Sequence, residues 1–415
     1  MNFLCFESNS LSISLMDIKK IYSSFWTLSG SMLEYYDYML FTYMIPVISA
    51  NLFGGHFGDS AEFGYALMLI AALFRPLGAM AMGYIGDVFG RKKALFLSIV
   101  LISFASMGIG LLPSYQYIGF STVILLLIFR VLQAMSAGGD LNGSAIFLIE
   151  HFGEKRAGLA SGVSWAFVVF GMALASLANY VISKPIFQPN GWRWAFIIGG
   201  SIGFVGMLAR AMIIEGEGFK KTAKQNYSPR SWYPYLSVIG IGAGIGGMYY
   251  YSMVYCFNFL KQSYGNQILY YQTLFFVFYA AVVVVSGILT DYFDIKKVMF
   301  FSVLALLILA FPCLLLISYG YIILSQMITV CLLGIFVGPS HNLTFQLFPP
   351  KYRYRYISLC YGIGTSIVGS ATPYLCTKFS QLNYFAPSLW MSFCAFLGML
   401  GVYFAKKSPT IDYED

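Results

Sequence analysis

The sequence predicts an all-α polytopic membrane protein with about twelve transmembrane helices, arranged as two pseudo-symmetric bundles of six. Three observations predict this class: 59% of the 415 residues are hydrophobic, only 10% are charged, and long apolar stretches recur from Tyr22 to the end of the chain. A bilayer core of about 30 Å is crossed by roughly 20 apolar helical residues, so about twelve spans fit. Such a composition excludes an ordinary soluble protein.

Pro/Gly clusters and basic connections delimit the individual spans. In order along the chain, they predict helices at 21–50, 64–86, 94–113, 119–149, 158–183, 193–214, 235–260, 269–290, 298–318, 321–347, 357–379 and 385–405. Two glycine pairs, Gly138-Gly139 and Gly246-Gly247, fall inside spans, with no preceding strand and no following Lys-Ser/Thr pair. We expect them to allow close contact between helices rather than to bind phosphate.

Basic residues mark the expected orientation. Most of the 25 Lys and Arg lie in alternate connections and at the two ends, whereas the opposite connections hold Lys184, Arg193, Lys261 and Lys378. The positive-inside rule therefore predicts cytoplasmic termini and an even number of spans. The expected location is a bacterial inner (plasma) membrane. The net charge of +8 does not predict nucleic-acid binding, because basic and aromatic residues do not interleave on one polar face.

A repeat supports the division into halves. Gly83, Asp87, Lys92 and Lys93 recur at one constant offset as Gly287, Asp291, Lys296 and Lys297, each set ending the second span of its half. The polar connection 215–231 separates the halves. The predicted organisation is a cytoplasmic tail (1–20), a six-helix bundle (21–214), a cytoplasmic linker (215–234), a second six-helix bundle (235–405) and a cytoplasmic tail (406–415).

The N-terminus does not resemble a signal peptide, because it lacks a basic n-region and Glu7 interrupts the apolar stretch. Met16 begins an ordinary transporter-like start, so the sequence leaves open whether residues 1–15 belong to the native protein.

The seven cysteines lie mostly within apolar stretches, with no CxxC or His-paired spacing, and are expected to be unpaired structural thiols. No metal site, cofactor motif or nucleophilic catalytic set is evident, so we expect no enzyme. The expected partners are a small solute, protons and the lipid bilayer, with a monomeric chain and no nucleic acid.

One loop carries the most specific local pattern. It combines a carboxylate at a helix end, a glycine turn and following cations, which can pair with that carboxylate and with helix ends; its residues are Gly83, Asp87, Gly90, Arg91, Lys92 and Lys93. This loop resembles the signature loop of the major facilitator superfamily. The resemblance implies the major facilitator fold, with a midplane site reached alternately from each side.

Three further stretches resemble the metabolite:proton symporter family, which includes proline/betaine and 2-oxoglutarate transporters. They are Leu33 to Tyr38, Phe74 to Gly78 and Arg130 to Asp140. The second half departs from the family pattern at Asp294-Ile295, Gln346 and Gly362. These departures weaken any transfer of substrate or coupling to this chain.

Five ionisable residues stand out within the predicted spans, where a charge costs at least a few kcal/mol. They are Glu34, Asp37, Arg75, Arg130 and Asp140. Glu34 and Asp37 are three residues apart and share a helix face, so repulsion and low dielectric favour a neutral acid. Three carboxylates against two guanidiniums also leave one excess negative charge, which one proton would cancel. We expect proton coupling at Asp37, with Glu34 and Asp140 as alternatives; internal ion pairing is the structural alternative.

Solute contacts are expected from both halves. Arg75 and Arg130, the two guanidiniums counted as deep in the spans, can each bind a carboxylate bidentately, which favours a monocarboxylate or zwitterion over a tricarboxylate. The remaining candidates are Gln133, Trp165, Tyr251, Tyr255 and His341. For the aromatic residues and His341, packing inside the protein is the alternative explanation, although tyrosine faces could also hold a quaternary ammonium group.

A cytoplasmic gate is expected at the signature loop and its repeat, formed by Gly83, Asp87, Gly90, Arg91, Glu150, Arg156 and Asp291. Gln346 cannot supply the charge that would match Glu150 in the second half, so the gate should be asymmetric.

The resulting hypothesis is a secondary active transporter that imports a small organic acid or zwitterion with protons by alternating access. Two alternatives share the fold: a drug/proton antiporter and a solute sensor that does not transport. The sequence does not determine the solute, the stoichiometry or the direction of transport.

Overall fold

The computed structural model describes residues 15–56, 60–213, 231–257, 259–260, 265 and 267–406. Residues 1–14, residues 215–230 of the predicted linker and residues 407–415 of the predicted C-terminal tail lie outside this part. Of residues 1–15, which the sequence leaves open as part of the native protein, all but residue 15 therefore lie outside the described residues.

The described residues are helical and contain no strand, which confirms the predicted fold class. The first half contains α1 (Leu15–Phe53), α2 (Ser60–Ala72), α3 (Arg75–Val88), α4 (Arg91–Leu111), α5 (Tyr115–Ile118), α6 (Ser121–Phe152), η1 (Glu154–Arg156), α7 (Ala157–Ile182), η2 (Pro185–Phe187) and α8 (Gly191–Ala211). The second half contains α10 (Tyr233–Tyr249), η3 (Tyr250–Tyr255), α12 (Gln267–Leu289), α13 (Ile295–Ser318), α14 (Ile322–Val337), α15 (Ser340–Phe345), α16 (Arg353–Gly364), η4 (Thr365–Gly369), α17 (Ser370–Leu382) and α18 (Ala386–Tyr403).

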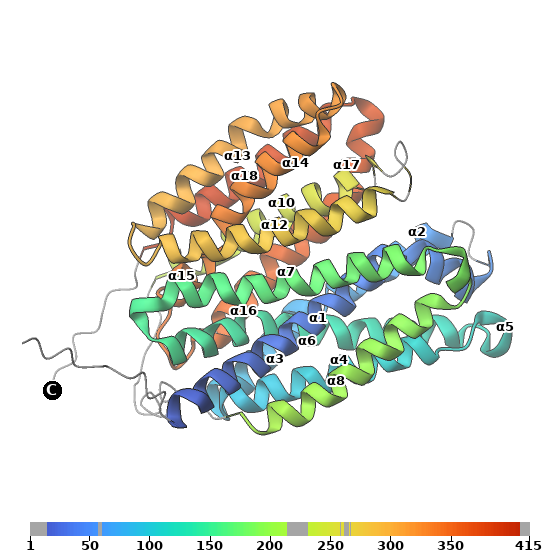
Figure 1. The fold of residues 1–415 in the computed structure, drawn as a ribbon, viewed down its shortest axis with the longest axis horizontal. Helices are drawn as coiled ribbons and strands as arrows, with labels where there is room; N and C mark the ends of the chain where they lie inside the picture. Colours follow the sequence, from blue (N-terminus) through green and yellow to red (C-terminus); the bar gives the residue numbers. More distant parts are fainter. Residues whose placement is uncertain are drawn as a thin grey trace, which may run out of the picture.

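Nine helical stretches within the described residues are long and apolar enough to cross a membrane. The other three predicted spans fall on α1, on α10 with η3, and on α16 with η4 and α17. The last two are interrupted by the π-helical turns η3 and η4. The helices of the first half lie together in the lower part of Figure 1, and most of those of the second half lie above them, whereas α16 lies below α7 among the helices of the first half.

The two halves meet most closely along α7 and α12, which lie side by side (Figure 1). A Cβ atom on Gly158 would meet the Gly287 carbonyl oxygen, and one on Gly162 would meet the Val283 carbonyl oxygen. Glycine therefore lets these two helices pack backbone against backbone.

The glycine pairs predicted to lie at helix contacts do so. A Cβ atom on Gly138 would meet the backbone of Arg75, and one on Gly246 would meet the backbone of Thr365. These contacts bring α6 against α3 and α10 against η4. They thereby set the positions of the backbone at Arg75, the first residue of α3, and at Thr365, the first residue of η4.

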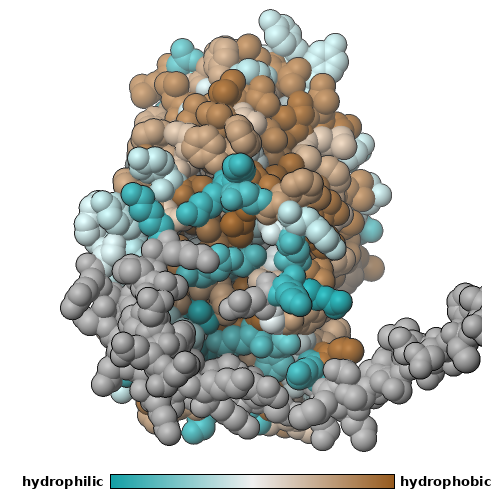
Figure 2. Space-filling model, turned by 90° about the vertical axis from the view of Figure 1, so that its left-hand side faces the viewer, coloured by the Kyte–Doolittle hydropathy of each residue, from teal (hydrophilic) through white to brown (hydrophobic). Residues whose placement is uncertain are grey.

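One end of the molecule carries the connections that contain Lys92, Lys155, Lys296 and Lys351; we call it the basic end. It is the left-hand end in Figure 1, and Figure 2 views it directly, with hydrophilic residues gathered on this face and hydrophobic ones around it. At this end, α3 and α4 are joined by Phe89 and Gly90. Gly90 has φ of 105°, a conformation that favours glycine.

Candidate functional site

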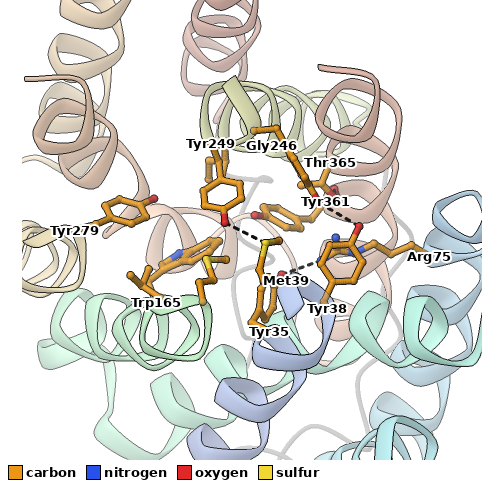
Figure 3. A pocket seen from close by; sticks show the side chains of 14 residues that line it. Tyr35, Tyr38, Met39, Arg75, Trp165, Gly246, Tyr249, Tyr279, Tyr361 and Thr365 are labelled. Atoms are coloured by element: carbon orange, nitrogen blue, oxygen red, sulfur yellow. Dashed lines mark hydrogen bonds between the residues drawn. The ribbon is translucent and has the colours of Figure 1, made fainter. Parts of the chain in front are cut away.

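A cavity lies between the two halves near the middle of the spans (Figure 3). Half of its 14 lining residues are aromatic, and the lining comes from α1, α3, α7, α10, η3, α12, α16 and η4: Tyr35, Tyr38, Met39, Arg75, Trp165, Val169, Met172, Ile245, Gly246, Tyr249, Tyr250, Tyr279, Tyr361 and Thr365. Its volume is about 40 Å³, far below the roughly 300 Å³ at which small-molecule sites begin. An amino-acid-sized solute can enter only after side chains move apart.

Arg75 supplies the charged group of this cavity. Its side chain is 6% exposed, donates a hydrogen bond of 2.8 Å to the Tyr35 hydroxyl, and lies 5.6 Å from the centre of the Tyr38 ring. None of the ion pairs among the described residues includes Arg75. A buried guanidinium with aromatic neighbours and no carboxylate partner is suited to bind a carboxylate.

The two halves touch across the cavity through tyrosines. The Tyr250 hydroxyl donates to the Tyr38 hydroxyl at 3.1 Å, and the Tyr249 hydroxyl lies 3.2 Å from the Met39 sulfur (Figure 3). Tyr250 begins the π-helical turn η3, and Thr365 begins the corresponding turn η4. Short π-helical turns are frequent at functional sites because the extra residue redirects side chains.

Arg130 lies outside the cavity lining and belongs to a hydrogen-bonded chain within the first half. It donates to Gln133 at 2.5 Å, Gln133 donates to the Ser106 hydroxyl at 2.9 Å, and Ser106 donates to Asp37. The Arg130 guanidinium also lies 3.9 Å from the centre of the Phe41 ring. This chain connects a buried cation to a buried carboxylate through two polar side chains.

Asp140 is held by an arginine that the sequence analysis did not single out, although it lies near the end of the predicted span 193–214. Arg210 in α8 is fully buried and donates to both Asp140 oxygens, at 2.5 and 3.2 Å. It also donates to the carbonyl oxygens of Leu95 and Thr27, and Gly30 leaves room for the guanidinium. The count of two deep arginines is therefore wrong. Away from the basic end, three buried guanidiniums (Arg75, Arg130 and Arg210) face three buried carboxylates (Glu34, Asp37 and Asp140) in this half, so the excess negative charge expected from the sequence is absent.

Glu34 differs from the other buried carboxylates. It is 1% exposed, and neither of its oxygens has a hydrogen-bond partner among the described residues. It lies within electrostatic range of Asp140, Arg210 and Arg75. Asp37, by contrast, accepts from Ser106 on one oxygen only. The arrangement keeps both acids as candidates for carrying a proton.

Other predicted solute contacts lie beside the cavity rather than in it. His341 in α15 stacks on Trp165 with 4.8 Å between ring centres, and the Trp165 ring nitrogen donates to the Ser340 hydroxyl. Tyr251 and Tyr255 pack against each other within η3 and do not line the cavity. Only Arg75 and Trp165 of the predicted solute contacts line the cavity, and for the other five a solute contact stays a prediction.

Tyr35 and Tyr38 line the cavity but were not predicted to do so, although both lie in the stretch Leu33 to Tyr38 that also contains Glu34 and Asp37. Tyr249 and Tyr250 directly precede the predicted contact Tyr251 in the same span, and the π-helical turn decides which of these tyrosines face the cavity. Sequence spacing carries no signal for that turn.

At the basic end, Asp87 joins the two halves. Its carboxylate accepts from the backbone N–H groups of Tyr354 and Arg355 at the start of α16, at 3.3 and 3.0 Å, and from Arg91 at 2.7 Å. A Cβ atom on Gly83 would meet the Arg355 backbone. A carboxylate at a helix N-terminus is favoured by the helix dipole.

Cations from both halves surround this contact. Glu150 pairs with Arg91 at 3.5 Å and with Arg353 at 3.9 Å, and Arg355 approaches Asp87 at 3.8 Å. Arg353 and Arg355 were not predicted. Arg156 was predicted to belong to this network, but it is exposed and forms no ion pair among the described residues; it sits in η1, on the outer side of the turn.

The second half repeats the contact, but no ion pair to Asp291 occurs among the described residues. Asp291 accepts from the backbone N–H groups of Gly158 and Leu159 at the start of α7, at 2.7 and 3.0 Å. Gln346 donates to Asn342 within its own half. The network at the basic end is therefore asymmetric, as predicted from Gln346.

An aromatic cavity between two helical halves, with a hydrogen-bonded network joining the halves at one end, is the architecture of a polytopic transporter. The model of the Major Facilitator Superfamily matches residues 27–271, and the chain belongs to this superfamily. Membership makes it a transporter rather than an enzyme.

Similar proteins point the same way. The glycine betaine/proline/ectoine/pipecolic acid transporter OusA of Dickeya dadantii is 26% identical over 91% of this chain and 82% of its own length. The proline/betaine transporter of Escherichia coli K12 is 26% identical over 89% and 80%. Among solved structures, the proton:xylose symporter XylE bound to 6-bromo-6-deoxy-D-glucose has a TM-score of 0.75 at 15% identity, over 93% of this chain and 95% of that chain. This likeness shows the fold.

Replacing Asp87 with Asn tests the contact at the basic end. Loss of the charge weakens bonds to the α16 N–H groups, each worth about 1.5–3 kcal/mol when charge-assisted. We expect amide hydrogen exchange at the start of α16 to speed up at least tenfold and transport to fall, with near-normal expression. Asp294→Asn is the control, because Asp294 caps only its own helix. Unchanged exchange in Asp87→Asn would show that the contact does not hold α16.

Replacing Arg210 with Met tests the buried pair. It leaves Asp140 without its cation, which typically costs about 3–5 kcal/mol, so we expect a clear loss of thermal stability in detergent. Arg193→Met is the control, since Arg193 is partly exposed, binds backbone carbonyls and the Trp192 ring, and forms no ion pair among the described residues. The double variant Arg210→Met/Asp140→Leu should recover part of the loss. Equal melting temperatures for Arg210→Met and wild type would contradict this account.

Proposed function

We propose that the chain is a secondary active importer of a small zwitterion or monocarboxylate, coupled to protons and working by alternating access. The observation that carries this proposal is Arg75, buried in an aromatic cavity with no carboxylate partner among the described residues. A solute carboxylate would complete that pair.

The aromatic lining favours a solute with a compact cationic group. Seven Tyr and Trp side chains line the cavity with Arg75, among them Trp165, Tyr249 and Tyr361. Ring faces stabilise quaternary ammonium groups. A zwitterion whose carboxylate binds Arg75 and whose ammonium faces the tyrosines fits both features, in keeping with the betaine and proline named for the similar transporters.

The location and organisation also belong to this proposal. The basic end is the cytoplasmic end, in agreement with the positive-inside rule, so the termini are cytoplasmic and the membrane is the bacterial inner membrane. Residues 21–214 and 235–405 act as two bundles that move relative to each other, with 215–234 as the linker. Closure at Asp87 and Asp291 holds the cytoplasmic side shut.

Arg75→Gln tests the solute site. Losing a bidentate, charge-assisted contact of about 1.5–3 kcal/mol weakens binding by at least tenfold. Binding of glycine betaine and of choline, which lacks the carboxylate, is measured by thermal shift or isothermal titration. Wild type should prefer glycine betaine, and Arg75→Gln should lose that preference.

Arg130→Lys is the matched control, because Arg130 lies outside the cavity lining and should leave the preference intact. If Arg75→Gln still prefers glycine betaine over choline, Arg75 does not bind the carboxylate.

Asp37→Asn tests proton coupling. Asn mimics the protonated acid while preserving its size, so solute exchange at equal concentrations should continue and pH-driven accumulation should be lost. Counterflow and accumulation are compared in proteoliposomes. Glu34→Gln and Asp140→Asn are tested alongside it, since those acids are the alternatives. Normal accumulation by Asp37→Asn would exclude Asp37 as the coupling residue. If the wild-type protein shows no counterflow, a solute sensor is favoured over a transporter.

A further inference from the structure

Tyr354 of the second half is buried inside the first half. It is the second residue of α16, and its side chain is 0% exposed. A Cβ atom on Gly86 of α3 would meet its ring, and one on Gly143 of α6 would meet its hydroxyl. These two glycines therefore form a socket that admits the tyrosine side chain because neither carries a side chain of its own.

The same residue belongs to the contact at the basic end. Its backbone N–H donates to Asp87, and its ring centre lies 5.7 Å from the guanidinium carbon of Arg91. Backbone and side chain thus bind the first half at two separate places. Because one residue makes both contacts, we expect the ring to enter the socket when the basic end closes and to leave it when that end opens.

The hydroxyl of Tyr354 is unusual in this setting. It is buried and has no hydrogen-bond partner among the described residues. The charged groups that face it are Asp140 on α6, Arg91 on α4, Arg210 on α8 and Glu34 on α1. A buried hydroxyl without a partner destabilises the state that buries it, whereas withdrawal from the socket would return it to water.

We propose that Tyr354 is a positioning residue that sets the balance between the closed and open states of the basic end: its ring locks into the Gly86/Gly143 socket, and its unpaired hydroxyl keeps that lock reversible. The inference rests on alternating access, as proposed above, but not on the identity of the solute. The ring stabilises closure through packing and through Arg91. The hydroxyl opposes it, so the two parts of one side chain act in opposite directions.

Two substitutions separate these effects. Tyr354→Phe keeps the ring and removes the unpaired hydroxyl, so the ratio of closed to open states should rise about tenfold, equivalent to about 1.4 kcal/mol. Gly143→Ala fills the socket at the position of the hydroxyl, so the ratio should fall at least tenfold. Alanine is a better helix former than glycine, so α6 itself should persist.

The ratio is measured by pulsed electron–electron double resonance without solute, between spin labels on Val88→Cys and Tyr292→Cys. Both positions are exposed, and they lie at the basic end in opposite halves. Tyr356→Phe is the control for the lost hydroxyl. Gly139→Ala is the control for crowding in α6, because a Cβ atom there would meet Met82 of the same half.

The expected result is a shift toward the short distance in Tyr354→Phe and toward the long distance in Gly143→Ala, with both controls like wild type. The proposal is overturned if Gly143→Ala keeps the wild-type distribution, if Gly139→Ala shifts it equally, or if Tyr354→Phe shifts it toward the long distance. Because no solute is present, failure here is distinct from failure of the solute assignment, which the glycine betaine and choline comparison decides.

Discussion

The two aspartates at the basic end hold the first half against the second by accepting backbone N–H groups from the opposite half. Asp87 binds the start of α16, and Asp291 binds the start of α7. The first N–H groups of a helix have no partner within it, so each carboxylate satisfies donors that lipid could not. The central cavity is enclosed at this end because these contacts exist. Their strength depends on the alignment of whole helices rather than on one side-chain pair.

The three buried arginines inside the first half have different partners. Arg210 and Asp140 satisfy each other and tie α8 to α6, with α1 and α4 held through carbonyl groups. Arg130 reaches Asp37 through Gln133 and Ser106. Arg75 is left facing the cavity with a tyrosine as its partner. Burying a charge without a counter-ion is costly, so a solute carboxylate at Arg75 would lower the energy of the occupied state.

Hydrophobicity and glycine spacing predicted the fold because the bilayer allows few alternatives: apolar stretches of the right length must be helices. The signature loop predicted Asp87 and Arg91 as partners, since their four-residue spacing fits a helix-end pair. The sequence could not show that Arg210, close to the basic linker, turns inward to Asp140. It also could not show the π-helical turns that select Tyr249 and Tyr250. Both depend on contacts between segments far apart in the chain.

Away from the basic end, the interior of the first half contains equal numbers of guanidiniums and carboxylates, three of each, and this balance affects the charge moved during transport. With all six ionised, these groups carry no net charge together, so under the proposed proton coupling the charge moved in each cycle would be that of the solute plus that of the proton. A monocarboxylate carried with one proton would then cross without current. A zwitterion carried with one proton would move one positive charge, and the membrane potential would contribute about 2.3 kcal/mol per 100 mV to its accumulation. The voltage dependence of uptake thus reports which class of solute occupies the cavity.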